Sequence, residues 1–149
     1  MDVPRLAEAV SLAASLVTVA GMFKVGLELI TSEGGPQTVR AIQAARWDKV
    51  FYDGKFKDIP QTVAGASRAV ARLGVTMFNV HCLSGFEAMQ AARKAAGAGA
   101  AEVFGIERPL VLGVTILTSL DIKELQRMGI APPMVAKEYL KALVVRLAK

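Results

Sequence analysis

The strongest structural signal in this sequence is a short apolar run that becomes charged within one residue. Val50, Phe51 and Tyr52 are typical of a strand buried on both faces. Asp53 and Lys55 follow directly and are two residues apart, so a strand would place both on the same face. A single charged residue at a strand end commonly marks the solvated start of a loop. Two charged residues on one face of a strand, in contrast, shift each other's pKa. The pattern therefore predicts a buried strand with a charged site at its carboxyl end.

The rest of the chain alternates segments of strand and helix character, with apolar strands and polar strand ends. This order is typical of a parallel α/β fold, and the length suits a single domain over residues 1–149. We expect strands over 23–29, from 50 onward, 75–81 and 109–117, helices over 4–16, 36–45, 59–73, 84–96, 121–129 and 132–149, and loops over 31–35 and 97–103.

Polar residues lie at the carboxyl ends of all the expected strands. In a parallel barrel these ends meet at one face, and the chemistry takes place there. Independent occurrence of a polar residue at each strand end would explain this pattern poorly, so we expect these residues to line one shared pocket. Its candidate residues are Lys24, Asp53, Lys55, His81 and Thr118.

Composition excludes several classes of function. No apolar run reaches the roughly 20 residues that cross a membrane. The single cysteine, Cys82, argues against a disulfide scaffold and indicates a reducing cytoplasm. One histidine and one cysteine make a zinc site improbable. The net charge of +5 is scattered along helical segments, which does not support a nucleic-acid surface but suits a small anionic substrate.

The segment from Asp53 to Pro60, Asp-Gly-Lys-Phe-Lys-Asp-Ile-Pro, resembles the Asp-x-Lys-x-x-Asp-Ile-Pro signature of the orotidine 5′-phosphate decarboxylase family. Residues 2–4, 23–26, 81–85 and 114–119 resemble other strand ends of that family, in the same order and spacing. The resemblance implies a cofactor-free (β/α) TIM-type barrel that forms a homodimer. It also implies the conversion of orotidine monophosphate to uridine monophosphate in pyrimidine synthesis, with neither a metal nor a nucleic-acid or membrane partner.

The resemblance assigns roles to the charged residues of the site. Lys55 would protonate the carbon from which carbon dioxide departs, and Asp53 would lie beside the substrate carboxylate. Lys24 would hold Asp53 and the ribose hydroxyls. A fixed ammonium suits this reaction, because negative charge develops on a ring carbon that has no adjacent electron sink.

Further roles involve a second subunit and the ends of the substrate. The resemblance implies that Asp58 reaches into the neighbouring subunit's site, with Ile59 and Thr62 beside it. For His81 the resemblance points to the ribose, and a structural role in the core stays open. The two remaining substrate contacts would be Asp2 to the ribose and Thr118 to the pyrimidine edge.

The chain departs from the family in size. A complete barrel needs about 250 residues, and its phosphate site usually comes from the loops after strands seven and eight. We therefore expect a partial barrel, about strands two to five with flanking helices, that is a fragment of a longer enzyme or is completed by a partner. Two alternatives are a magnesium-dependent sugar-phosphate lyase or synthase that shares Asp-x-Lys-x-x-Asp, and a non-catalytic half-barrel assembly module. The segments 58–62 and 118–119 favour the decarboxylase over the lyase.

Overall fold

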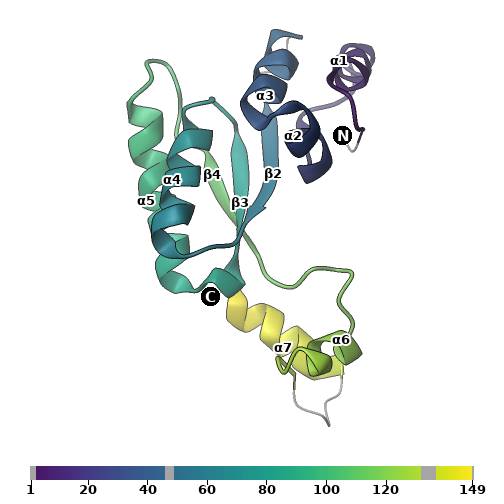
Figure 1. Cartoon of the computed structure of the whole chain (residues 1–149), viewed down its shortest axis with the longest axis vertical. Coiled ribbons are helices and arrows are strands. Elements are labelled where there is room, and N and C mark those ends of the chain that lie inside the picture. Colours follow the sequence, from purple (N-terminus) through teal and green to yellow (C-terminus); the bar gives the residue numbers. More distant parts are fainter. Residues whose placement is uncertain (1–2, 46–48, 132–136, 149) are drawn as a thin grey trace.

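A single parallel sheet organises the chain. The computed structural model describes residues 3–45, 49–131 and 137–148 (Figure 1). The strands pair in the order β1-β2-β3-β4, and all three pairs are parallel. The predicted parallel α/β fold is therefore confirmed. The strands are β1 (Phe23–Val25), β2 (Val50–Phe56), β3 (Met77–His81) and β4 (Leu110–Val114).

Helices cover one face of this sheet and extend beyond its ends. α4 and α5 lie side by side against the sheet, whereas α6 and α7 lie beyond its carboxyl edge (Figure 1). None of the helices in the described ranges is long and apolar enough to cross a membrane. The helices are α1 (Leu6–Ser15), α2 (Leu27–Glu33), α3 (Gly35–Ala44), α4 (Pro60–Ala71), α5 (Phe86–Ala101), α6 (Ile122–Arg127) and α7 (Lys137–Leu147), with a 3₁₀ turn over Cys82–Ser84.

The core lies between the strands and the helices. Phe78 and Val80 lie on the same face of β3 and are almost fully buried in the core. The helices contribute small side chains to the same cluster, including Ala92 and Ala96 of α5. Small residues let a helix approach the sheet closely, and burial of the apolar surface supplies the main driving force. This core fixes the sheet from which the site residues project.

Two predicted boundaries at the start of the chain are wrong. The strand expected over 23–29 ends at Val25, and residues 27–33 form α2 instead of continuing the strand into a loop. Gly26 starts α2 in an extended conformation, and Leu29 becomes its buried residue. The expected loop over 31–35 is reduced to the break at Gly34, whose φ of +83° ends α2 and starts α3. A short apolar run does not separate strand from helix by pattern alone.

Two boundaries in the second half are also wrong. The connector expected over 97–103 is mostly helix, because α5 continues to Ala101. Alanine is the best helix former, and packing against α4 compensates for the glycines. The strand expected over 109–117 ends at Val114. The prolines expected to start the last helix lie outside the described residues.

Candidate active site

The carboxyl end of β2 carries a bulge. Tyr52 pairs with Phe78 and Phe56 pairs with Val80, so the segment between them on β2 faces Asn79 alone on β3. Bulges of this kind redirect side chains and are common beside active sites. Lys55 lies within the bulge and has a φ of +47°, a region that residues other than glycine seldom occupy. The backbone is therefore held in an unfavourable conformation where the charged motif begins.

Two lysines meet one carboxylate at this edge. Lys55 Nζ lies 2.6 Å from Asp53 Oδ1, and Lys24 Nζ, from β1, lies 3.1 Å from Asp53 Oδ2. Asp53 is 6% exposed, whereas both lysine side chains remain partly open to solvent. Ionised donors and acceptors make the stronger hydrogen bonds, and a buried carboxylate needs such partners. The structure thus brings together three of the predicted site residues.

Asn79 completes the cluster, and our sequence analysis did not select it. Its Nδ2 donates to Asp53 Oδ1 over 2.6 Å, and its Oδ1 accepts from the Lys55 backbone N–H over 2.7 Å. A signal was present in the sequence, because Asn79 is a polar residue inside an apolar strand and shares a face with His81. A buried amide is costly without hydrogen bonds, so such a residue implies a partner nearby.

The cluster keeps the Asp53 carboxylate ionised. Burial by itself would raise the pKa of Asp53. Hydrogen bonds from the three donors, and the positive charge of Lys55, outweigh burial, so the pKa lies below the ordinary value of 3.8. The site therefore holds a negative charge on Asp53, between the side chains of Lys24 and Lys55.

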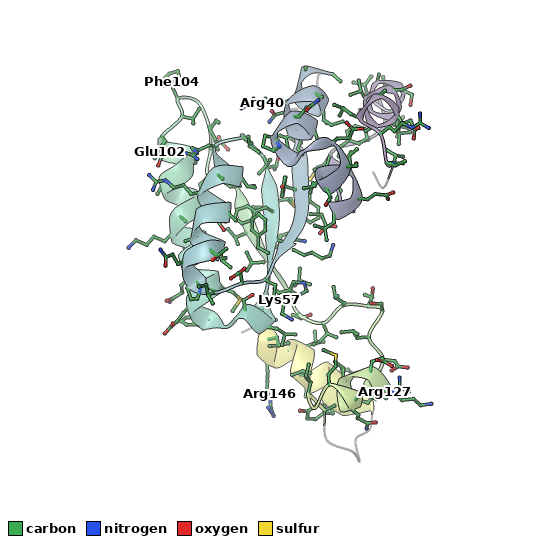
Figure 2. All side chains as sticks on the ribbon, viewed as in Figure 1. Arg40, Lys57, Glu102, Phe104, Arg127 and Arg146 are labelled. Carbon is green, nitrogen blue, oxygen red and sulfur yellow. The ribbon has the colours of Figure 1, made fainter. Side chains whose placement is uncertain are left out.

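His81 lies at the carboxyl end of β3, as predicted. It is 8% exposed, and its Nδ1 has no hydrogen-bond partner among the described residues. Burial lowers the pKa of His81, and the charges of Lys57 and Lys55 lower it further. The ring is therefore neutral near pH 7 and has an unused polar atom. Lys57 itself is exposed and lies at the carboxyl edge of the sheet (Figure 2).

Four of the remaining predicted residues, Asp58, Ile59, Thr62 and Thr118, are exposed. Asp58 is exposed, and its Oδ1 accepts from the Ile59 backbone N–H over 2.7 Å. Ile59 is 64% exposed, and Thr62 is exposed on the first turn of α4. Thr118 is exposed beyond the end of β4, and Asp2 lies outside the described residues.

The arrangement can stabilise and protonate a carbanion. An ammonium held beside a carboxylate offers positive charge and a proton at one place, with little reorganisation during reaction. Among the described residues, no group of three or more histidine, cysteine or acidic side chains is placed to hold a metal ion. The side chains that the site brings together are those of Lys24, Asp53, Lys55 and Asn79.

Comparisons with known proteins point to one family. A family model described as "Orotidine 5′-phosphate decarboxylase / HUMPS family" matches residues 1–148. The orotidine 5′-phosphate decarboxylase of Moorella thermoacetica is 48% identical over 126 residues, which are 85% of this chain and 49% of the relative. That of Pelobacter propionicus is 42% identical over 148 residues, 99% of this chain and 57% of the relative. The chain thus spans about half the length of the curated relatives it matches.

Solved structures agree with this likeness. The crystal structure of orotidine 5′-phosphate decarboxylase from Lactobacillus acidophilus superposes with a TM-score of 0.79 at 27% identity. The superposition covers 100% of this chain and 63% of that one. The fold is therefore that of part of a (β/α) TIM-type barrel, as the sequence predicts.

Proposed function

Because the chain belongs to the orotidine 5′-phosphate decarboxylase / HUMPS family, we propose that it supplies the catalytic half of an orotidine 5′-phosphate decarboxylase. The reaction releases carbon dioxide from orotidine monophosphate and forms uridine monophosphate, without a cofactor. The observation that carries this proposal is the Lys55 ammonium, 2.6 Å from the Asp53 carboxylate at the carboxyl edge of the sheet. This edge is where barrels of this type place their chemistry.

Lys55 is the proposed acid. The bond between the ring carbon and the carboxyl carbon breaks, and its electron pair stays on the ring carbon as carbon dioxide leaves. The Lys55 ammonium stabilises that charge as it develops and then donates a proton to the same carbon. Water returns a proton to the amine afterwards. Arginine would serve poorly here, because a guanidinium does not give up a proton at physiological pH.

Asp53 and Lys24 prepare the site for this step. Asp53 lies beside the substrate carboxylate in our proposal, where two negative charges would disfavour the bound substrate and not the product of carbon dioxide loss. Lys24 contacts the other oxygen of Asp53 over 3.1 Å and is 38% exposed, so it can also reach a ribose hydroxyl. The alternation of charges keeps the groups in place before the substrate binds.

A second subunit is part of the proposal. Asp58, Ile59 and Thr62 are exposed beside one another at the start of α4, which leaves them free to contact a partner's site. A homodimer in the cytoplasm would use Asp58 in this way. The proposed substrate contacts are Asp2 and His81 to the ribose and Thr118 to the pyrimidine edge.

The test replaces the proposed acid. Lys55→Ala is expected to lower turnover of orotidine monophosphate by about 10²–10⁴-fold, since it removes both the proton donor and its charge. The matched control is Lys94→Ala, which removes an exposed lysine beside Arg68 on the α4–α5 pair and should leave turnover unchanged. Turnover is followed by ultraviolet absorbance, with and without a chelator, and folding by circular dichroism.

Three outcomes decide between the readings. Turnover in Lys55→Ala equal to that of the unsubstituted chain contradicts the assignment of the acid. Activity that a chelator abolishes favours the magnesium-dependent lyase. A chain that forms a stable oligomer and binds no uridine monophosphate supports the non-catalytic assembly module.

A further inference from the structure

We propose that Asn79 is a positioning residue, which fixes the Asp53 carboxylate and the Lys55 backbone in one geometry through a single side-chain amide. This inference rests on the proposed function, because it names the residue that prepares the acid of that reaction. Asn79 adds one neutral residue, from β3, to the charged residues of the motif on β2.

Asn79 is buried, so its amide depends on other protein groups for its hydrogen bonds. Asn79 is 4% exposed, and its neighbours on β3, Phe78 and Val80, are buried against the helices. An amide buried without partners would destabilise the fold. Both polar ends of the Asn79 side chain have a partner, and both partners belong to the charged motif.

The two hydrogen bonds determine the orientation of the amide. Oδ1 faces a backbone N–H, which only donates, and Nδ2 faces a carboxylate, which only accepts. The flipped amide would bring two donors together at Lys55 and two acceptors together at Asp53. Asparagine therefore matches this place in a way that aspartate, with two acceptors, does not.

The first hydrogen bond acts on the backbone of Lys55. The bulge leaves Asn79 as the only β3 residue facing Asp53, Gly54 and Lys55, so the regular ladder is interrupted there. The Asn79 side chain supplies the acceptor that the ladder would otherwise provide to the Lys55 N–H. It thereby stabilises the positive φ of Lys55, and with it the direction in which the Lys55 side chain leaves the strand.

The second hydrogen bond acts on the carboxylate of Asp53. Asp53 Oδ1 accepts from both Asn79 Nδ2 and Lys55 Nζ, and Oδ2 is left to Lys24. The neutral donor fixes the rotation of the carboxylate without adding charge. Among the described residues, the charged groups paired with Asp53 are Lys24 and Lys55, so loss of the Asn79 donor leaves the orientation of the carboxylate to two long lysine side chains.

Two substitutions separate these effects. Asn79→Ala removes both hydrogen bonds, whereas Asn79→Asp keeps an acceptor for the Lys55 N–H and places a second carboxylate against Asp53. The control is Ser67→Ala on α4, which also removes a buried polar group but one whose Oγ has no partner among the described residues. Each chain is studied by NMR titration of the Asp53 carboxyl carbon and by hydrogen exchange of the Lys55 amide.

We expect the pKa of Asp53 to rise in Asn79→Ala and to rise further in Asn79→Asp, and to stay unchanged in Ser67→Ala. The Lys55 amide should lose protection in Asn79→Ala and keep it in Asn79→Asp. In turnover, kcat should fall about a hundredfold in both variants with a smaller change in KM, because misplacement of the reacting groups acts on the chemical step. A merely structural residue would lower stability without moving the pKa of Asp53.

An unchanged pKa of Asp53 in a folded Asn79→Ala chain overturns the proposal. If that variant does not fold, the unsubstituted chain still decides, because rapid exchange of the Lys55 amide would also overturn it. The NMR measurements need no substrate. A chain that passes them but fails to decarboxylate orotidine monophosphate contradicts the proposed function and leaves the geometry of Asn79 standing.

Discussion

Asp53 is a buried carboxylate whose two oxygens receive three donors, from β1, β2 and β3. Its surroundings depend on Gly54, the next residue in the bulge. A Cβ at Gly54 would lie 2.7 Å from Tyr52 Cε1, closer than real Cβ contacts, and 3.0 Å from Phe56 Cε1, which is tighter than most of them. The rings of Tyr52 and Phe56, whose centroids are 6.1 Å apart, thus require a glycine between them. At this scale, the motif combines a charged face with a glycine that leaves room for two neighbouring aromatic rings.

The neutral state of His81 gives a prediction about pH. The folded pKa of His81 lies below the ordinary value of 6.5, so in the window between the two the folded chain binds fewer protons than the unfolded chain. Its contribution to stability is therefore full above that value and is lost as the pH falls below it. Between about pH 7.5 and about pH 5, the denaturation midpoint of the unsubstituted chain should fall more steeply than that of His81→Gln. Parallel curves for the two chains would contradict the assignment.

The helices α4 and α5 pack closely against each other at Gly99. A Cβ at Gly99 would lie 2.5 Å from the backbone oxygen of Arg68, so the two helices meet backbone to backbone at this point. The charged ends of the same helices are tied by Glu102, which pairs with Arg68 and Arg72. Glu102 and Phe104 lie at the end of the sheet opposite Lys57 (Figure 2). This pair of helices supports β2 and β3, the strands that carry the site.

Gly99→Ala should therefore destabilise the chain by about 1–3 kcal/mol, because the added methyl group meets fixed backbone atoms. Gly97→Ala is the matched control in the same helix, since a Cβ there would meet only Arg108 Cδ at 3.5 Å, an ordinary contact. It should stabilise the chain by up to about 1 kcal/mol, because alanine favours helix over glycine. Denaturant unfolding measures both changes. An equal gain in stability for the two variants would show that the helices do not approach this closely.

The same helix shows where sequence reasoning about elements succeeds and fails. The order of the strands follows from apolar periodicity, and the expected strands and helices have counterparts in the described ranges, but α2 formed where a strand and a loop were expected. The end of α5 does not follow, because Gly97 and Gly99 read as a flexible connector when their neighbours in space are unknown. The contact with Arg68 turns Gly99 from a helix breaker into a packing residue. Local pattern therefore locates elements well and their ends poorly.

On the scale of the whole molecule, the sheet is open. β1 and β4 each pair on one side only among the described residues. Leu110 on β4 is 59% exposed and Leu112 is 37% exposed, so the outer edge combines unpaired backbone with apolar side chains. Such edges pair readily with other chains. The matched relatives are about twice as long as the region they share with this chain.

The isolated chain should therefore self-associate as its concentration rises. Leu110→Lys should shift the sedimentation profile toward the monomer, because a lysine on an edge strand opposes pairing with another edge. Phe104→Lys is the control, since it removes a fully exposed apolar residue that lies outside the sheet, and it should leave association unchanged. A monomer at every concentration tested would contradict the prediction.

The amino-acid sequence alone determined the succession of strands, the buried strand that turns charged, and the meeting of Lys24, Asp53 and Lys55. These features depend on spacing within a strand and on the rule that parallel strands end at one edge. The tertiary structure alone decided the role of Asn79, which is 24 residues from Lys55 and 26 from Asp53 along the chain. A bulge changes which residues face one another, and periodicity within one strand contains no information about the register of its neighbour.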